Sequence, residues 1–308
     1  MQNSKLLRLL AMLFALVLVA AACGSDADDS ADGTSDDTSS DSSDDSGDSG
    51  DTDADAGDSE DEVELTQGGG TLAAVQARGS LNCGVSGAAV AFSFTQPDGS
   101  VTGLDADYCR AVAAAVLGDA EAVEFVPLTA ADRFPALASG EIDVLSRNTS
   151  QTASRTGDEG AAFPLTTFYD GQGFMVPADG GVTTIDDLAG ATVCVLAGTT
   201  TALNVEAEGV DRDLGLSLLQ FDFNEELSGA YLAGQCDAWT SDVTVLSSFR
   251  REFPTPDDHV ILSDLITSEP LSLAVAAGDS EWATAVEWSA MLTIQAWDAG
   301  IDSTNLDA

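Results

Sequence analysis

The sequence predicts an α/β fold built as two similar halves, each with a largely parallel sheet. Short apolar runs alternate with helical patterns along residues 81–146, and the same alternation begins again near residue 184. A local repeat links the halves, since Leu137–Asp143 and Leu232–Asp237 both read as a helix end, a glycine and a short strand opened by aspartate. Strands and helices in this order are typical of α/β proteins.

The first half contains three strands and two helices in alternation. Asp105 stands where it can cap the first helix, and Gly118 ends that helix. Thr129 and Asp132 have the spacing of a capping box at the start of the second helix, which Gly140 ends. The expected elements are strand 81–85, helix 106–117, strand 123–127, helix 129–139 and strand 142–146.

The second half repeats this order after another capping box, formed by Thr184 and Asp187. After Pro270, the chain is expected to pack back on the first half, so that two segments cross between the halves. The expected elements are strand 192–196, a short helix after 198–201, strand 218–221, helix 225–233, strand 238–240, helix 243–249, strand 271–276 and helix 280–299.

The repeat also places two polar residues. Asn148 and Asp242 each lie five positions after the aspartate that opens the repeated strand. Both should therefore lie just past the carboxyl ends of equivalent strands, where open α/β sheets bind ligands. Asp242 has an alternative role as the cap of the helix that starts at Val243.

Arginines are scarce in this acidic chain, and two of them, Arg147 and Arg155, lie in one polar stretch. A guanidinium fork suits a carboxylate, so an anion site is one interpretation, and surface arginines that balance nearby acids are the other. The turn Gly198-Thr199-Thr200-Thr201 offers hydroxyls and N–H groups to an anion, or acts as a plain helix cap. It is not a P-loop, because it has no lysine.

The charge distribution excludes several classes of function. The chain has 10 Lys and Arg against 53 Asp and Glu, a net charge of −43. A nucleic-acid binder needs a basic face, and so does a protein that docks on anionic lipid. Residues 24–65 hold acidic residues and no basic one among Ser, Gly, Ala and Thr, so we expect a disordered acidic tether at 24–70.

The N-terminus predicts export. Lys5 and Arg8 precede an apolar run at 9–22 that has the length of a signal-peptide core. Small residues directly before Cys23 are typical of a bacterial lipoprotein signal, so residues 1–23 are expected to be a lipoprotein signal peptide with lipidated Cys23. Ordinary secretion without lipidation is the alternative. Any membrane attachment is expected only through this lipid.

Four further cysteines in an exported chain suggest disulfides, and three connectivities are possible. Pairing neighbours in order joins Cys83–Cys109 and Cys194–Cys236, which we take as the prediction; the other pairings and four buried thiols stay open. No cysteine or histidine spacing indicates a metal, and we expect no cofactor. The single histidine, His259, is expected to be structural.

Five segments together carry a resemblance to a known family; they are Gly103–Arg110, Ile142–Thr149, Tyr169–Val176, Gly198–Asn204 and Glu269–Leu271. Through them, the chain from about Thr71 to its end resembles the amino-acid-binding proteins of bacterial ABC uptake systems, family 3 of the solute-binding proteins, and within them the general L-amino-acid-binding type. The resemblance implies a type II periplasmic-binding-protein fold, with lobe 1 at 71–174 plus 271–308 and lobe 2 at 175–270.

The resemblance also implies a mechanism and site residues. A monomeric receptor would close its lobes on an L-amino acid and dock on an ABC permease, without catalysis. Arg155 would bind the carboxylate and Asp242 the ammonium. Thr199 and Thr200 would add donors to the carboxylate, and Asn148 and Ser150 would contact the ammonium side. Members of the family continue beyond the position that matches Ala308. We therefore expect either that this sequence is a fragment or that its first lobe has less helical cover.

Two alternatives remain for a chain of this fold. One is a periplasmic dehydratase that acts on cyclic amino-acid precursors, which would need a general acid over its substrate. The other is an amino-acid sensor that reports to a membrane kinase.

Overall fold

The computed structural model describes residues 70–302 and 304–305 of the chain. The predicted signal peptide at 1–23, the lipidation of Cys23 and the tether up to residue 69 lie outside these residues. Among the described residues, no helix has the length and apolar character that a membrane span requires.

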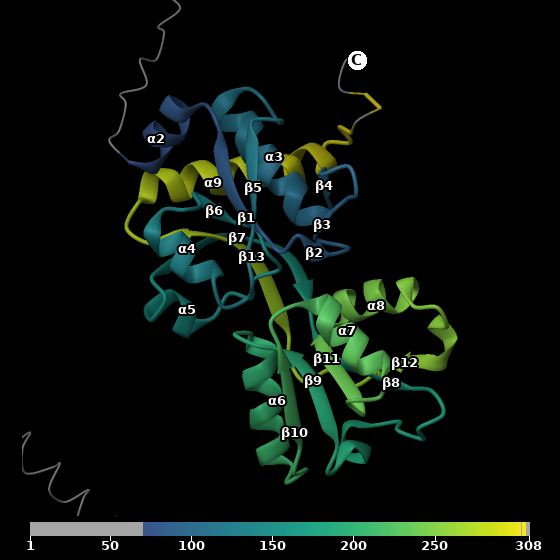
Figure 1. The fold of residues 1–308 in the computed structure, drawn as a ribbon. Coiled ribbons are helices and arrows are strands. Elements are labelled where there is room, and N and C mark those ends of the chain that lie inside the picture. The colour runs from purple at the N-terminus through teal and green to yellow at the C-terminus, as the bar shows by residue number, and fades with distance from the viewer. Residues whose placement is uncertain (1–69, 303, 306–308) are drawn as a thin grey trace, which may run out of the picture. The chain divides into compact units, whose positions relative to one another are not determined.

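The first of two five-stranded sheets has the strand order β5-β1-β6-β13-β7 (Figure 1). Strand β1 pairs in parallel with β5 and β6, whereas β13 runs antiparallel to β6 and β7. The first sheet is therefore mixed, whereas the sequence predicted a largely parallel sheet. Its strands are β5 (Val123–Pro127), β1 (Leu81–Val85), β6 (Val144–Leu145), β13 (Glu269–Ala276) and β7 (Ala161–Asp170).

Helices cover both faces of this sheet. One face packs against α2 (Thr71–Arg78), α3 (Leu104–Leu117) and α9 (Ser280–Asp298), and the other against α4 (Arg133–Ser139). Adjacent residues of β6 go to opposite faces, Val144 to the first core and Leu145 to the second. The short helix α5 (Ala153–Gly157) follows on the β7 side.

The second sheet has the order β10-β9-β11-β8-β12 and is also mixed. Strand β9 is parallel to β10 and β11, while β8 is antiparallel to β11 and β12. Helix α6 covers one face, and α7 and α8 cover the other. The elements are β8 (Gln172–Pro177), β9 (Thr192–Leu196), α6 (Thr200–Asp211), β10 (Ser217–Phe221), α7 (Asn224–Leu232), β11 (Ala238–Asp242), α8 (Val243–Glu252) and β12 (His259–Ile261).

Small elements complete the described chain. A three-stranded sheet lies between β1 and α3, and two 3-10 turns lie on the side of the second sheet. Gly103 follows this small sheet with φ 120°, and a Cβ there would lie 2.5 Å from the Phe92 carbonyl oxygen, so the close approach requires glycine. These elements are β2 (Ala88–Ala89), β3 (Ser93–Thr95), β4 (Val101–Thr102), η1 (Ile185–Leu188) and η2 (Pro256–Asp258).

The chain passes between the two sheets at two places. It leaves the first sheet after Asp170 and enters the second at Gln172, and it returns between β12 and Glu269. A buried polar network joins the two crossings, because the Asn204 amide donates to Gln172 Oε1 at 3.0 Å and to Glu269 Oε1 at 3.1 Å. These bonds connect helix α6 to both crossing segments.

Several local predictions differ from the structure. Asp105 does not cap α3, which starts after Gly103 and places Asp105 in its first turn, buried. The helix expected from Thr129 starts only at Arg133, because residues 130–132 form a turn. The Asp242 side chain makes no capping bond to α8. The Thr184–Asp187 capping box is confirmed, although the turn that it opens is a 3-10 helix.

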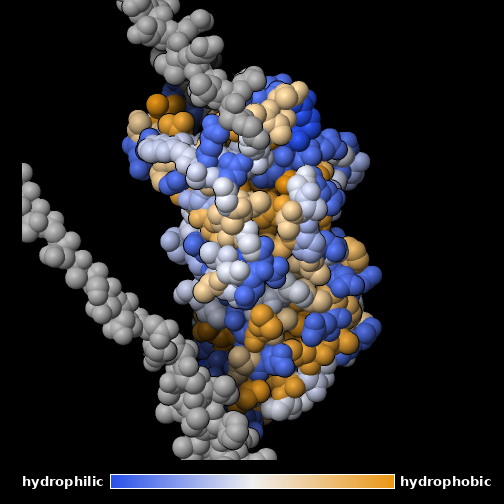
Figure 2. All heavy atoms as spheres, turned by 90° about the vertical axis from the view of Figure 1, so that its left-hand side faces the viewer, coloured by the Kyte–Doolittle hydropathy of each residue, from blue (hydrophilic) through white to orange (hydrophobic). Residues whose placement is uncertain are grey.

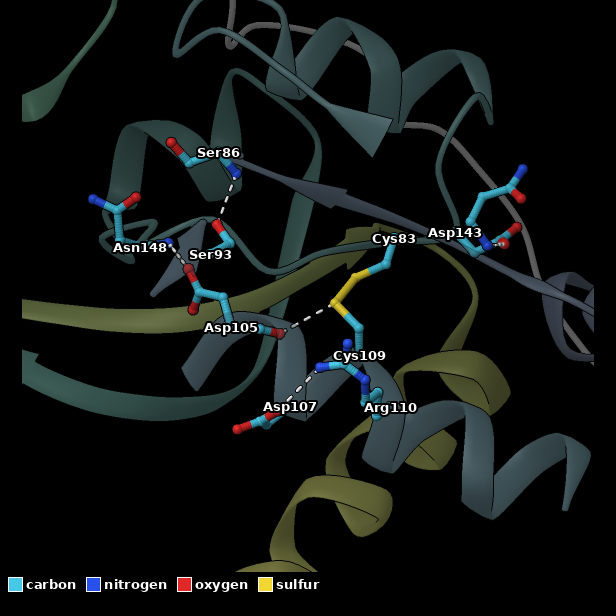
Figure 3. Close-up of a disulfide and its surroundings, with 10 residues drawn as sticks. Cys83, Ser86, Ser93, Asp105, Asp107, Cys109, Arg110, Asp143 and Asn148 are labelled. Carbon is cyan, nitrogen blue, oxygen red and sulfur yellow. Dashed lines mark hydrogen bonds and ion pairs between the residues drawn. A yellow bond between two sulfur atoms is a disulfide. The ribbon is translucent and has the colours of Figure 1, made fainter. Parts of the chain in front are cut away.

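Two disulfides join cysteines that are neighbours in sequence order. Cys83 of β1 is bonded to Cys109 of α3, as Figure 3 shows. Cys194 of β9 is bonded to Cys236, which precedes β11. Each bond therefore ties a central strand to a segment of its own sheet's layer, and neither connects the two sheets.

The single histidine is part of a core. His259 lies in the second layer, where its Nδ1 is 3.0 Å from the Tyr231 hydroxyl and its ring contacts Phe253. Exposed apolar residues occur elsewhere on this layer. On the face of the molecule that Figure 2 shows, hydrophobic residues gather where α6 and β10 lie. The exposed Leu203 and Val210 belong to α6.

Candidate functional site

A polar pocket lies where residues that follow β6 meet residues of the second sheet's layer. All six residues that the sequence places in a ligand site line this one pocket, although they come from segments far apart in the chain. These six are Asn148, Ser150, Arg155, Thr199, Thr200 and Asp242. The pocket is also lined by Arg133, Arg147 and Asn224.

The acidic end of the pocket is Asp242, the last residue of β11. Its side chain is 5% exposed, and its Oδ2 accepts a hydrogen bond from the Asn148 amide at 3.2 Å. Burial raises the pKa of Asp242 to about 7, and the nearby Asp170 and Glu269 carboxylates add to the rise. A cation bound here would relieve the cost of a buried negative charge.

The loop that carries Asn148 is held by Asp105. Asn148 has φ 33°, a backbone conformation that asparagine tolerates better than most residues. Its backbone N–H donates to Asp105 Oδ2 at 2.7 Å, and Figure 3 shows the two residues facing each other across this bond. Burial raises the pKa of Asp105 to about 6. Sequence reasoning treated Asp105 as a helix cap and missed this role.

The basic side of the pocket is formed first by Arg155. This side chain is buried, its Nη1 donates to the Ser150 carbonyl oxygen at 2.6 Å, and its guanidinium lies 5.3 Å from the Phe134 ring centroid. Burial lowers the pKa of Arg155 from its ordinary value. A fixed and desolvated guanidinium of this kind is a site for a carboxylate.

Arg133 stands beside Arg155 and was missed by sequence reasoning. Its guanidinium lies 5.3 Å from the same Phe134 ring, and its Nη2 donates to the Gly198 carbonyl oxygen at 3.2 Å. Burial and the positive charge of Arg155 hold the pKa of Arg133 well below its ordinary value. Two neighbouring guanidinium groups repel each other, so an anion between them would be stabilising.

Arg147 lies on another side of the pocket. It is buried, and its Nε donates to the Leu128 carbonyl oxygen at 3.0 Å. Burial lowers the pKa of Arg147 to about 10, against the attraction of Asp105. The signal that marked Arg147 in the sequence was its rarity in an acidic chain; Arg133 shared that rarity but lay inside an expected helix.

The threonine turn before α6 serves as a helix cap and also lines the pocket. The Thr199 hydroxyl accepts from the Ala202 N–H at 3.1 Å and donates to the Leu196 carbonyl oxygen at 2.6 Å. The Thr200 hydroxyl lies 3.4 Å from that of Ser150, which follows β6. The capping interpretation therefore describes Thr199, while Thr200 contacts the other side of the pocket.

This arrangement suits a small molecule that carries both signs of charge. Three guanidinium groups and the carboxyl group of Asp242 line one pocket, and they come from the layers of two different sheets. Because burial weakens solvation, each group interacts strongly with an opposite charge placed between them.

Comparison with known proteins finds a family whose model matches most of this chain. The family model for bacterial extracellular solute-binding proteins, family 3, matches residues 81–294. The general L-amino acid-binding periplasmic protein AapJ of Rhizobium johnstonii is 43% identical over 237 residues, which cover 77% of this chain and 70% of the relative.

Solved structures show the same likeness. A periplasmic binding protein of an ABC transporter from Brucella ovis, with glutathione bound, is 43% identical, with a TM-score of 0.74 over 76% of this chain and 74% of that chain. An ancestral amino acid-binding protein, described as a precursor of cyclohexadienyl dehydratase, is 27% identical, with a TM-score of 0.64 over 73% of this chain and 94% of that chain.

Proposed function

Because the chain belongs to the bacterial extracellular solute-binding proteins of family 3, we propose that it is the amino-acid-binding receptor of an ABC importer. A single observation carries this proposal: Arg155 and Asp242 are buried in one pocket. The two side chains have opposite charges, and they come from the layers of different sheets. The general L-amino acid-binding relative supports the ligand class.

In this proposal the ligand is held as a zwitterion. Arg155 binds the α-carboxylate, with Thr199 and Thr200 as further donors, and Asp242 binds the α-ammonium. Asn148 and Ser150 contact the ammonium side. The hydrogen bond from Asn148 to Asp242 supports this, because it orients the carboxylate toward the pocket.

Binding is coupled to closure of two lobes, expected at 71–174 plus 271–308 and at 175–270, although the strands of the second sheet already begin at Gln172 and those of the first resume at Glu269. The two crossing segments act as the hinge, and closure excludes water from the charged contacts. The closed form docks on the permease. We expect a monomer, exported by the signal at 1–23 and anchored through lipidated Cys23 on the outer face of the cytoplasmic membrane.

Two other functions fit the fold less well. A dehydratase is suggested by the ancestral neighbour, but the acidic group that lines the pocket, Asp242, is here assigned to the zwitterion. Turnover of prephenate or arogenate would favour that alternative. A sensor would transmit binding to a kinase, and a permease and ATPase encoded beside this chain would favour transport instead.

The test is a calorimetric titration of the purified chain with the twenty amino acids and with glutathione, the ligand of the Brucella ovis structure. We expect Arg155→Ala and Asp242→Ala to lower affinity at least about a hundredfold, since each leaves a desolvated charge unpaired. Arg251→Ala, at an exposed position, is the matched control. If both pocket variants bind like the control, these residues are not the site.

A further inference from the structure

A second pocket opens from the ligand pocket, and four residues at the junction line both of them. Arg147 and Asn224 line both pockets, together with Ser86 and Leu196. None of the six residues assigned above to the zwitterion lines the second pocket. Another pocket that adjoins the ligand pocket shares Arg155, Thr199 and Thr200 with it, on the side assigned to the α-carboxylate. The junction is therefore a direction away from that side in which the side chain of a bound amino acid can extend.

At this junction the guanidinium of Arg147 has N–H donors that pair with no acceptor among the described residues. Its Nε is bound to the Leu128 carbonyl oxygen at 3.0 Å, and within residues 70–302 neither Nη atom has a hydrogen-bond partner. A guanidinium carries five N–H donors in a planar fork. The fork of Arg147 is therefore free to bind a planar anion at the mouth of the second pocket.

Asn224, the first residue of α7, is the second unfilled group. Its side chain is 6% exposed, and its Oδ1 is buried with no hydrogen-bond partner in the described part of the chain. A buried amide oxygen that lacks a donor is costly, so the amide should either accept from a donor of the ligand or turn so that its nitrogen takes this place. A half-turn of the amide exchanges Oδ1 and Nδ2, which lets Asn224 donate to an anion held by Arg147.

The charges of the pocket favour an anionic side chain. Three guanidinium groups line the pocket, and among residues 70–302 the only carboxyl group that lines it with them is that of Asp242. Asp105 does not line the pocket, but its carboxyl group attracts the guanidinium of Arg147. The carboxyl groups of Glu159, Glu269 and Asp170 also lie outside the lining and interact with the charged groups of the pocket. A zwitterion has no net charge, so after it has paired with Arg155 and Asp242, positive charge remains at Arg133 and Arg147.

We propose that Arg147 and Asn224 bind a second carboxylate, at the end of the ligand's side chain, so that the receptor prefers acidic amino acids. This inference rests on the proposed function, because it assumes that the zwitterion lies between Arg155 and Asp242. The exposed Asp132 and Asp222 line the outer part of the second pocket and repel a carboxylate that reaches beyond the junction. The ligand's second carboxylate therefore lies at the junction itself.

The experiment is calorimetry with L-glutamate, L-glutamine and L-serine, which share the zwitterion and differ in the side chain. Wild type is expected to bind glutamate at least about tenfold more tightly than glutamine, since a charge-assisted bond is stronger than a neutral one. Arg147→Met is expected to lower glutamate affinity about a hundredfold and serine affinity by no more than about fivefold. Asn224→Leu should lower glutamate affinity about tenfold.

Controls separate this inference from the proposed function. Arg251→Met changes an exposed arginine and should bind all three ligands like wild type. Arg147→Lys keeps the charge without the fork and should lie between wild type and Arg147→Met, which provides a folded variant if the methionine variant does not fold. Equal affinity of wild type for glutamate, glutamine and serine would overturn the inference and leave the receptor function standing. An equal loss for glutamate and serine in Arg147→Met would overturn it as well. Failure of all amino acids to bind would overturn both.

Discussion

The amide of Asn148 donates to the carboxylate of Asp242 at 3.2 Å, although one residue follows β6 of the first sheet and the other ends β11 of the second. Both residues follow the repeated pattern of helix end, glycine and strand. The bond brings a loop of one layer against a strand end of the other, beside the three guanidinium groups of the pocket. Asp242 is buried at this contact, and under the proposed function its protonation state should affect ligand binding.

Ligand affinity is expected to fall as the pH falls from 8 to 5.5. The pKa of Asp242 is raised to about 7 in the free protein, and only the carboxylate attracts the ligand's ammonium group. Below this pKa each pH unit weakens binding by up to about tenfold. Calorimetry across this range is the measurement, and Asp242→Asn should bind weakly with little pH dependence. A wild-type affinity that is constant from pH 8 to 5.5 would contradict the assignment of Asp242.

The stability of the ligand-free protein is expected to change in the opposite direction. Because the folded-state pKa of Asp242 lies above its ordinary value of 3.8, its contribution to stability is lost as the pH rises through about 7. The unfolding free energy of wild type, relative to that of Asp242→Asn, should therefore fall by about 2 kcal/mol between pH 5.5 and pH 8, because the contribution is complete only below the unfolded-state pKa. Urea denaturation of both proteins at the two pH values tests this, and the comparison cancels the titration of His259.

Gly198 lies where the two sides of the pocket approach each other closely. A Cβ at this residue would lie 3.0 Å from Ala131 Cα and 3.1 Å from Ala131 N, backbone atoms in the turn before α4. We expect Gly198→Ala to lower ligand affinity at least about fivefold, because closure would push backbone against the added methyl group.

Gly234→Ala is the matched control for this prediction. Gly198 has φ 67° and Gly234 has φ 70°, so alanine is strained at both, but a Cβ at Gly234 has no atom within 4 Å among the described residues. Both variants should lose about 1 kcal/mol of stability, and only Gly198→Ala should lose affinity. The same affinity in both variants would show that the contact with Ala131 does not limit closure.

The two disulfides are expected to stabilise their layers independently. They close loops with sequence separations of 26 and 42 residues. In the chain-entropy picture, Cys83→Ser with Cys109→Ser should lower the unfolding free energy by roughly 3–4 kcal/mol, and Cys194→Ser with Cys236→Ser by a similar amount. Urea denaturation of each double variant measures this. A loss below about 1 kcal/mol would mean that the unfolded chain is already constrained without the bond.

Local patterns in the sequence predicted many elements because their signals lie within a few residues. Strands β1 and β9 start and end where their apolar runs do, and the Thr184–Asp187 box opens a helical turn. Elements without such signals were missed, above all β7 and β8. These strands depend on antiparallel partners that lie far later in the chain, at β13 for β7 and at β11 for β8.

By itself the sequence determined the α/β class, the family resemblance and the residue types of a charged site, because these follow from periodicity, spacing and motifs. Only the tertiary structure decided that Arg133 and Asn224 face the pocket, and that Asp105 holds the Asn148 loop instead of capping α3. The physical reason is that a pocket is a property of side chains brought together by long-range packing. The helix pattern placed Arg133 inside an expected helix and Asn224 directly before another, but only the packed sheets determine that α4 and α7 begin at the same cavity.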